Sequence, residues 1–146
     1  MGTTCGPTIH TVLVVEDHED TACLLRFVLE REGFVVVHVF DGKHARHVIT
    51  TTAPPDLIFL DIMLSSSTGL QLLRIIKMTP EWQQIPVILL TADARSEIMI
   101  AAANLGATEY VLKPFTSERV MKSVHQFLPR TGIHHGGKSG NAYVAQ

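Results

Sequence analysis

Five short apolar runs alternate with five segments of helical periodicity along most of the chain. The runs are rich in valine, isoleucine and leucine and cover residues 11–15, 34–40, 56–60, 87–90 and 110–112. Continuous runs of this kind are typical of strands that are buried on both faces, and helices that join them return the chain across the sheet. We therefore predict an α/β fold, a doubly wound five-stranded parallel sheet with helices on both faces.

Length and composition favour a single domain with one sizeable core. The chain has 146 residues, of which 46% are apolar and 18% are charged. Residues 1–9 are expected to form a flexible lead, residues 10–128 the domain, and residues 129–146, which are rich in glycine, a tail or linker. The two cysteines indicate no disulfide framework, which fits a cytoplasmic protein.

The charge and hydropathy patterns argue against two classes of partner. A net charge of -2 provides no basic surface for nucleic acid or for an anionic membrane. No apolar stretch approaches the roughly 20 residues that span a bilayer. We therefore expect neither direct nucleic-acid binding nor membrane binding.

Polar residues gather where the predicted strands end. Glu16 and Asp17 follow the first run, Asp61 the third, Thr91 the fourth and Lys113 the fifth. In a doubly wound sheet, binding sites form outside the carboxyl ends of the strands, so these side chains should meet at one edge. A carboxylate buried there costs several kcal/mol unless it is paired or bound to a metal.

Phosphoryl chemistry suits this set of side chains. Three adjacent carboxylates repel one another, and Mg²⁺, which prefers oxygen ligands, relieves the repulsion. A lysine and a hydroxyl can hold phosphoryl oxygens, and a carboxylate beside the metal can act as the nucleophile that forms an aspartyl-phosphate. Asp61, at the end of the central apolar strand, is the best-placed nucleophile.

The order of these motifs resembles the receiver domain of two-component response regulators, of the chemotaxis-regulator kind. The resemblance covers roughly residues 10–128 and rests on motifs that fall in the family's order: Glu16-Asp17, Leu60-Asp61-Ile62-Met63, Gly69, Thr91-Ala92, Gly106-Ala107 and Tyr110-Val111-Leu112-Lys113-Pro114-Phe115. It implies a flavodoxin-like three-layer sandwich with strand order 2-1-3-4-5. It also implies a cis peptide bond between Lys113 and Pro114.

The resemblance assigns a role to each site residue. Asp61 would be the catalytic phospho-acceptor, assisted by Lys113 and Thr91, and Ala92 and Met63 would bind the phosphoryl group. Glu16, Asp17, Asp61 and the backbone carbonyl of Met63 would hold Mg²⁺. Thr91 and Tyr110 would form the switch that reports phosphorylation.

The same resemblance implies the partners. A histidine kinase or a histidine phosphotransfer protein would donate the phosphoryl group, and the chain would catalyse only its own phosphorylation and dephosphorylation. A downstream protein would bind through the fourth helix, the fifth strand and the last helix. We expect a monomer or a weak homodimer, and the sequence is compatible with a stand-alone receiver or with part of a larger protein.

Two departures from the family pattern concern the site. Ser65 stands where proline is usual, so the loop after Asp61 should be less rigid, and Glu16 replaces the commoner aspartate, which lengthens its reach to the metal. Met63 and Asp93 occupy the positions that tune the rate of dephosphorylation in the family. None of these changes removes a group that the chemistry requires.

Three other functions fit less well. A phosphohydrolase of the haloacid-dehalogenase kind needs a second aspartate two residues after the nucleophile, where this chain has Met63. A flavodoxin relative would place a flavin phosphate where the acidic pair Glu16-Asp17 stands. Residues 132–139 match the phosphate-loop pattern, but a helix and Pro129 precede them and only seven residues follow, so we expect no nucleotide site there.

Overall fold

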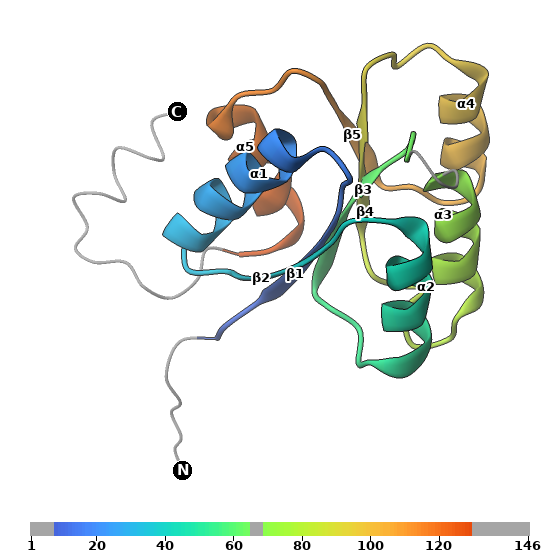
Figure 1. Ribbon diagram of the computed structural model, residues 1–146, viewed down its shortest axis with the longest axis horizontal. Helices are drawn as coiled ribbons and strands as arrows, with labels where there is room; N and C mark the ends of the chain where they lie inside the picture. Colours follow the sequence, from blue (N-terminus) through green and yellow to red (C-terminus); the bar gives the residue numbers. More distant parts are fainter. Residues whose placement is uncertain (1–7, 65–68, 130–146) are drawn as a thin grey trace.

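Strands and helices alternate along the computed structural model, which describes residues 8–64 and 69–129 (Figure 1). The strands are β1 (Thr11–Val15), β2 (Val35–Val39), β3 (Leu57–Asp61), β4 (Val87–Thr91) and β5 (Glu109–Leu112). The helices are α1 (Glu19–Arg31), α2 (Gly42–Thr51), α3 (Gly69–Met78), α4 (Glu97–Asn104) and α5 (Ser117–Phe127). Every predicted strand and helix is present. The expectations for Ser65, for residues 1–7 and for residues 130–146 lie outside the described residues.

The five strands form one parallel sheet in the order β2-β1-β3-β4-β5. This confirms the predicted flavodoxin-like order. The strand order reverses between β1 and β3. These two strands pair directly with each other, and Val15 lies opposite Leu60. The carboxyl ends of these two strands therefore lie side by side, at the point where doubly wound folds place their sites.

Each face of the sheet has its own core. In Figure 1, α1 and α5 cover one face, and α2, α3 and α4 cover the other. Successive side chains of a strand point to opposite faces, so Val12 and Val14 pack toward α1 and α5, while Leu13 and Val15 pack toward the other layer. All residues of β3 and β4 are buried, which explains why every residue before the last one of each strand is apolar.

Gly69 starts α3 in close contact with the backbone that carries Asp61. Its N–H donates a hydrogen bond of 3.0 Å to the carbonyl of Ile62. A Cβ atom added at Gly69 would lie 2.5 Å from the carbonyl oxygen of Asp61 and 2.7 Å from the Cα of Ile62. Only glycine allows this approach without a shift of the backbone, so Gly69 fixes how closely α3 lies behind the end of β3.

Substitution of Gly69 by alanine should therefore destabilise the fold. We expect Gly69→Ala to lower the free energy of unfolding by about 1–3 kcal/mol, because the contact is with backbone atoms that cannot turn aside. Urea denaturation measures the change. Arg74→Ala, an exposed position on the same helix, is the control and should change the value by less than about 0.5 kcal/mol. A Gly69→Ala protein as stable as this control would contradict the prediction.

Candidate functional site

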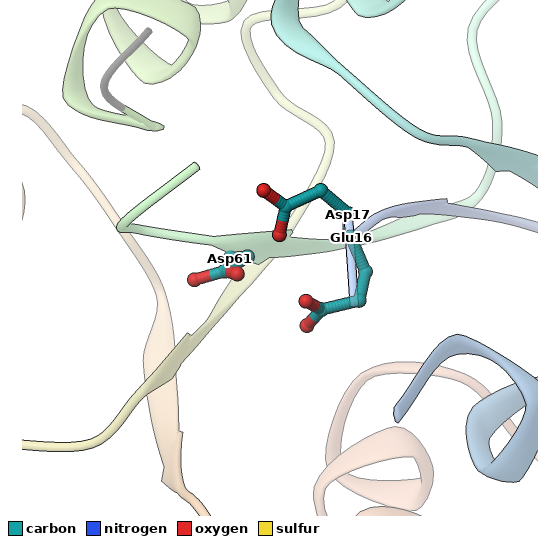
Figure 2. A group of neighbouring side chains, drawn as sticks. All are labelled: Glu16, Asp17 and Asp61. Atoms are coloured by element: carbon teal, nitrogen blue, oxygen red, sulfur yellow. The ribbon is translucent and has the colours of Figure 1, made fainter. Parts of the chain in front are cut away.

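Three carboxyl groups gather at the ends of β1 and β3 (Figure 2). Glu16 and Asp17 directly follow β1, and Asp61 is the last residue of β3. One carboxylate oxygen from each of the three lies within 4.8 Å of the others. Glu16 is fully buried and Asp61 is 4% exposed. The structure thus brings together the three acids that the sequence predicts as metal ligands.

Lys113 extends from the end of β5 into this acidic group. Its Nζ lies 3.0 Å from Oε1 of Glu16 and 3.3 Å from Oδ2 of Asp61. Its backbone N–H donates to the carbonyl of Thr91 at 2.8 Å, which ties β5 to β4 beside the site. The peptide bond between Lys113 and Pro114 is cis, as the resemblance implies.

Burial and charge shift two pKa values within this group. Burial raises the pKa of Glu16, and the nearby carboxyl of Asp61 raises it further, so the attraction of Lys113 does not restore its ordinary value. Burial acts to lower the pKa of Lys113, but its attraction to Glu16 and Asp61 outweighs burial and raises that pKa. Lys113 therefore stays charged while Glu16 resists ionisation.

The donor set fits a hard divalent cation. The carboxylates of Glu16, Asp17 and Asp61 and the ammonium of Lys113 lie together, so these four side chains carry excess negative charge when all are ionised. Oε1 of Glu16 is buried and lies 3.0 Å from the ammonium of Lys113, which is one partner for an oxygen that can accept two hydrogen bonds. A buried carboxylate oxygen with spare acceptor capacity among other carboxylate oxygens is suited to Mg²⁺.

Thr91, Ala92 and Met63 lie around the acidic group in different orientations. Thr91 is buried, and its hydroxyl donates to the carbonyl of Asp93 at 3.2 Å and accepts from the N–H of Asp93 at 3.1 Å. Ala92 follows it and is exposed. The N–H of Met63 donates to Oδ1 of Asp61 at 2.9 Å, while the Met63 side chain is 60% exposed.

Tyr110 lies on β5, where it pairs with Leu89, and is 43% exposed. Its side chain lines a hollow of about 240 Å³ together with Met99 and Ile100 of α4. The carbonyl of Tyr110 accepts a hydrogen bond of 3.0 Å from Nη2 of Arg119 on α5. Tyr110 thus stands on a surface shared by α4, β5 and α5.

Two histidines that the sequence analysis did not single out contact Glu16. Nε2 of His38 lies 2.9 Å from the carbonyl oxygen of Glu16, and the backbone N–H of His18 donates to Oε2 of Glu16 at 3.0 Å. The histidines show no ligand spacing in the sequence. The His38 contact depends on the alignment of β2 against β1, which places His38 opposite Val14. Only that alignment would have identified it.

The family model described as the response regulator receiver domain matches residues 12–125. The chain belongs to this family. The match favours a signalling receiver over the dehalogenase-like and flavodoxin-like alternatives. Within the described residues, no helix is both long enough and apolar enough to span a bilayer.

Individual relatives agree with this assignment. The phosphate regulon transcriptional regulatory protein PhoB of Rhizobium meliloti (strain 1021) is 37% identical over 119 residues, which are 82% of this chain and 52% of that protein. The probable transcriptional regulatory protein TcrX of Mycobacterium tuberculosis is 37% identical over 123 residues, 84% of this chain and 51% of that protein. The chain spans about half the length of these curated relatives.

Solved structures of similar fold include two that are covered completely. The chemotaxis response regulator CheY4 of Vibrio cholerae has a TM-score of 0.77 at 25% identity, over 83% of this chain and 100% of that chain. A response regulator from Chloroflexus aurantiacus J-10-fl has a TM-score of 0.75 at 28% identity, over 84% of this chain and 100% of that chain.

The raised pKa of Glu16 predicts how the metal-free protein responds to pH. Because that pKa lies above the ordinary 4.5, the folded chain keeps a proton that the unfolded chain releases. The contribution of Glu16 to the unfolding free energy is therefore greatest below pH 4.5 and falls as pH rises through the folded pKa. Glu16→Gln should remove this loss, so the variant should gain stability relative to the parent as pH rises. Urea denaturation with a chelator present measures the difference.

Asp41→Asn is a control of opposite sign. The backbone N–H and the side chain of His44 lower the pKa of Asp41, so its contribution is present at neutral pH and is lost as pH falls. The stability of Asp41→Asn relative to the parent should therefore fall as pH rises. A stability difference between Glu16→Gln and the parent that does not change with pH would contradict the assignment for Glu16.

Proposed function

We propose that the chain is a phosphorylation switch that accepts a phosphoryl group on Asp61 from the phosphohistidine of a kinase or a histidine phosphotransfer protein. The observation that carries the proposal is the ammonium of Lys113, 3.3 Å from a carboxylate oxygen of Asp61, among two further carboxylates. A nucleophile, a cation and acidic groups suited to Mg²⁺ are the parts that phosphoryl transfer requires.

The transfer balances without another reactant. A carboxylate oxygen of Asp61 forms a bond to phosphorus as the phosphorus–nitrogen bond of the donor histidine breaks, and the leaving imidazole takes up a proton. Lys113 would then pair with the phosphoryl oxygens, and the backbone N–H groups of Ala92 and of Met63, which now donates to Oδ1 of Asp61, would donate to them. Glu16, Asp17, Asp61 and the carbonyl of Met63 would hold Mg²⁺, which when bound neutralises charge on the transferred group.

A hollow beside Lys113 provides room for the donor to approach. Its volume is about 350 Å³, and its lining includes Leu24 on α1 and the residues Lys113, Pro114 and Phe115 that follow β5. Leu24 is 38% exposed and Phe27, one turn further along α1, is 59% exposed. Exposed apolar side chains on the helix that lines this hollow suit a protein donor that must bring its histidine to Asp61.

The surface of α4, β5 and α5 is the proposed output. Ile100 on α4 is 62% exposed, and Tyr110 and Leu112 on β5 are 43% and 45% exposed. A downstream protein that prefers one orientation of Tyr110 would select the phosphorylated state. A monomer or weak homodimer and a cytoplasmic location remain predictions. The absence of direct nucleic-acid contact also remains a prediction. The similar PhoB and TcrX are named as transcriptional regulatory proteins, and the chain spans about half the length of each.

Removal of the acceptor tests the proposal directly. Asp61→Asn should abolish Mg²⁺-dependent labelling by acetyl phosphate, because the amide is not a nucleophile, and a chelator should abolish labelling of the parent. Phosphate-affinity gels or intact-mass measurement would detect the product. The control is Asp56→Asn at the opposite end of β3, where the side chain accepts a hydrogen bond from the N–H of Thr11 at 2.8 Å. This control should label fully, and labelling of Asp61→Asn at the parent's stoichiometry would refute the proposal.

The role of Thr91 predicts a separation of labelling from response. Thr91→Ala removes one hydroxyl from the phosphoryl site, so labelling should slow by no more than about tenfold, the effect of one hydrogen bond. The response of Tyr110 to phosphorylation should be lost. Fluorine NMR of fluorotyrosine-labelled protein reports it, with Tyr143→Phe to assign the second tyrosine. A Tyr110 signal that shifts equally in both proteins would show that Thr91 is no part of the switch.

A further inference from the structure

The side chain of His38, which is outside the predicted set, forms a hydrogen bond to the backbone of Glu16, a predicted metal ligand. It lies half-buried on the edge strand β2, and its Nε2 is 2.9 Å from the carbonyl oxygen of Glu16. A carbonyl oxygen only accepts hydrogen bonds, so Nε2 carries the hydrogen and donates it. The imidazole also contacts the ring of Phe40, with ring centroids 4.1 Å apart.

The geometry of the sheet explains why this donor is needed. The N–H of Glu16 donates to the carbonyl of Val39 at 3.2 Å, the last bond between β1 and β2. In a parallel pair, the next bond would run from the N–H of Asp41 to the carbonyl of Glu16. Strand β2 ends at Val39, however, and Asp41 turns away to cap α2. The imidazole of His38 therefore takes the place of a backbone donor.

His38 and Glu16 also share a face of the sheet. His38 lies opposite Val14 in the pairing of β1 with β2, and side chains alternate along a strand, so Val14, Glu16 and His38 point toward the layer of α1 and α5. Glu16 is anchored a second time by the N–H of His18, which donates to its carboxylate at 3.0 Å. Backbone and carboxylate of Glu16 are thus each held by a histidine residue.

We infer that His38 is a positioning residue of the metal site: its imidazole N–H fixes the peptide that joins Glu16 to Asp17, so that both carboxylates face the cation before it binds. The inference rests on the proposed function only in that the three acids take up Mg²⁺. Hydrogen bonds that orient metal ligands typically change metal affinity by about 10–100-fold when they are removed.

Two substitutions separate the hydrogen bond from the packing of the ring. His38→Phe keeps an aromatic ring against Phe40 but removes the donor, and it should weaken Mg²⁺ binding about tenfold in calorimetry on the full chain. His38→Gln restores an N–H donor and should stay within about threefold of the parent, less than 1 kcal/mol. His47→Phe, at an exposed position on α2, controls for loss of a histidine and should bind Mg²⁺ like the parent.

Labelling by acetyl phosphate gives a second measure. At saturating Mg²⁺ the His38→Phe protein should label at the parent's rate, and at low Mg²⁺ it should be slower. Equal Mg²⁺ affinity of His38→Phe and the parent would overturn the inference. If His38→Phe does not fold, His38→Asn replaces it, because its amide is too short to reach Glu16, and equal affinity of His38→Asn and His38→Gln would overturn the inference instead.

The two proposals fail in different ways. A parent protein that binds Mg²⁺ more tightly than His38→Phe but is never labelled on Asp61 contradicts the proposed function and supports the role of His38. A parent protein that is labelled on Asp61 and binds Mg²⁺ no better than His38→Phe contradicts only the role of His38.

Discussion

An excess of negative charge at the edge of the sheet is the constraint on which the site depends. Glu16, Asp17 and Asp61 bring three carboxylates within 4.8 Å, and Lys113 supplies one positive charge. Burial raises the pKa of Glu16 and the carboxyl of Asp61 raises it further, while attraction to these two acids raises the pKa of Lys113 against the effect of its own burial. A protein gains no stability from such an arrangement, because buried ion pairs recover little more than the cost of their desolvation. The proposed function accounts for the acids, because it requires a site that holds a cation and phosphoryl oxygens.

The pairing of the strands in the parallel sheet sets the positions of these groups. Strands β1 and β3 pair directly, so acids that follow each strand must meet. Lys113 arrives from β5, two strands away from β3, and its backbone is held by the carbonyl of Thr91 on β4 between them. The close approach of Gly69 to the carbonyl of Asp61 fixes the start of α3 behind the acceptor. Each functional side chain thus comes from a strand end whose position is set by the buried core rather than by the site itself.

The sequence predicts most of this site and misses the parts that depend on alignment between strands. Apolar runs and their polar ends are local features, so Glu16, Asp61 and Lys113 could be assigned to one edge once the strands were recognised. The tilt of Thr91 toward Asp93, rather than toward Asp61, is a property of the loop after β4. The hydrogen bond from His38 to Glu16 follows from the position at which β2 stops pairing with β1. No spacing in the sequence carries that information.

The orientation of Thr91 bears on how the proposed switch would work. Its buried hydroxyl both donates to and accepts from the backbone of Asp93, so turning it toward a phosphoryl group gives up two hydrogen bonds. Each is worth about 0.5–1.5 kcal/mol net. A phosphoryl oxygen offers a charged acceptor in exchange, roughly twice as strong as a neutral one. The two orientations would therefore differ by only a few kcal/mol, small enough for phosphorylation to reverse the preference. Because the carbonyl of Thr91 holds the N–H of Lys113, a movement of Thr91 also reaches the residues that follow β5. Because the two orientations are close in free energy, phosphorylation would change the orientation of Thr91. A side chain with only one possible hydrogen-bond partner would keep the same orientation in both states.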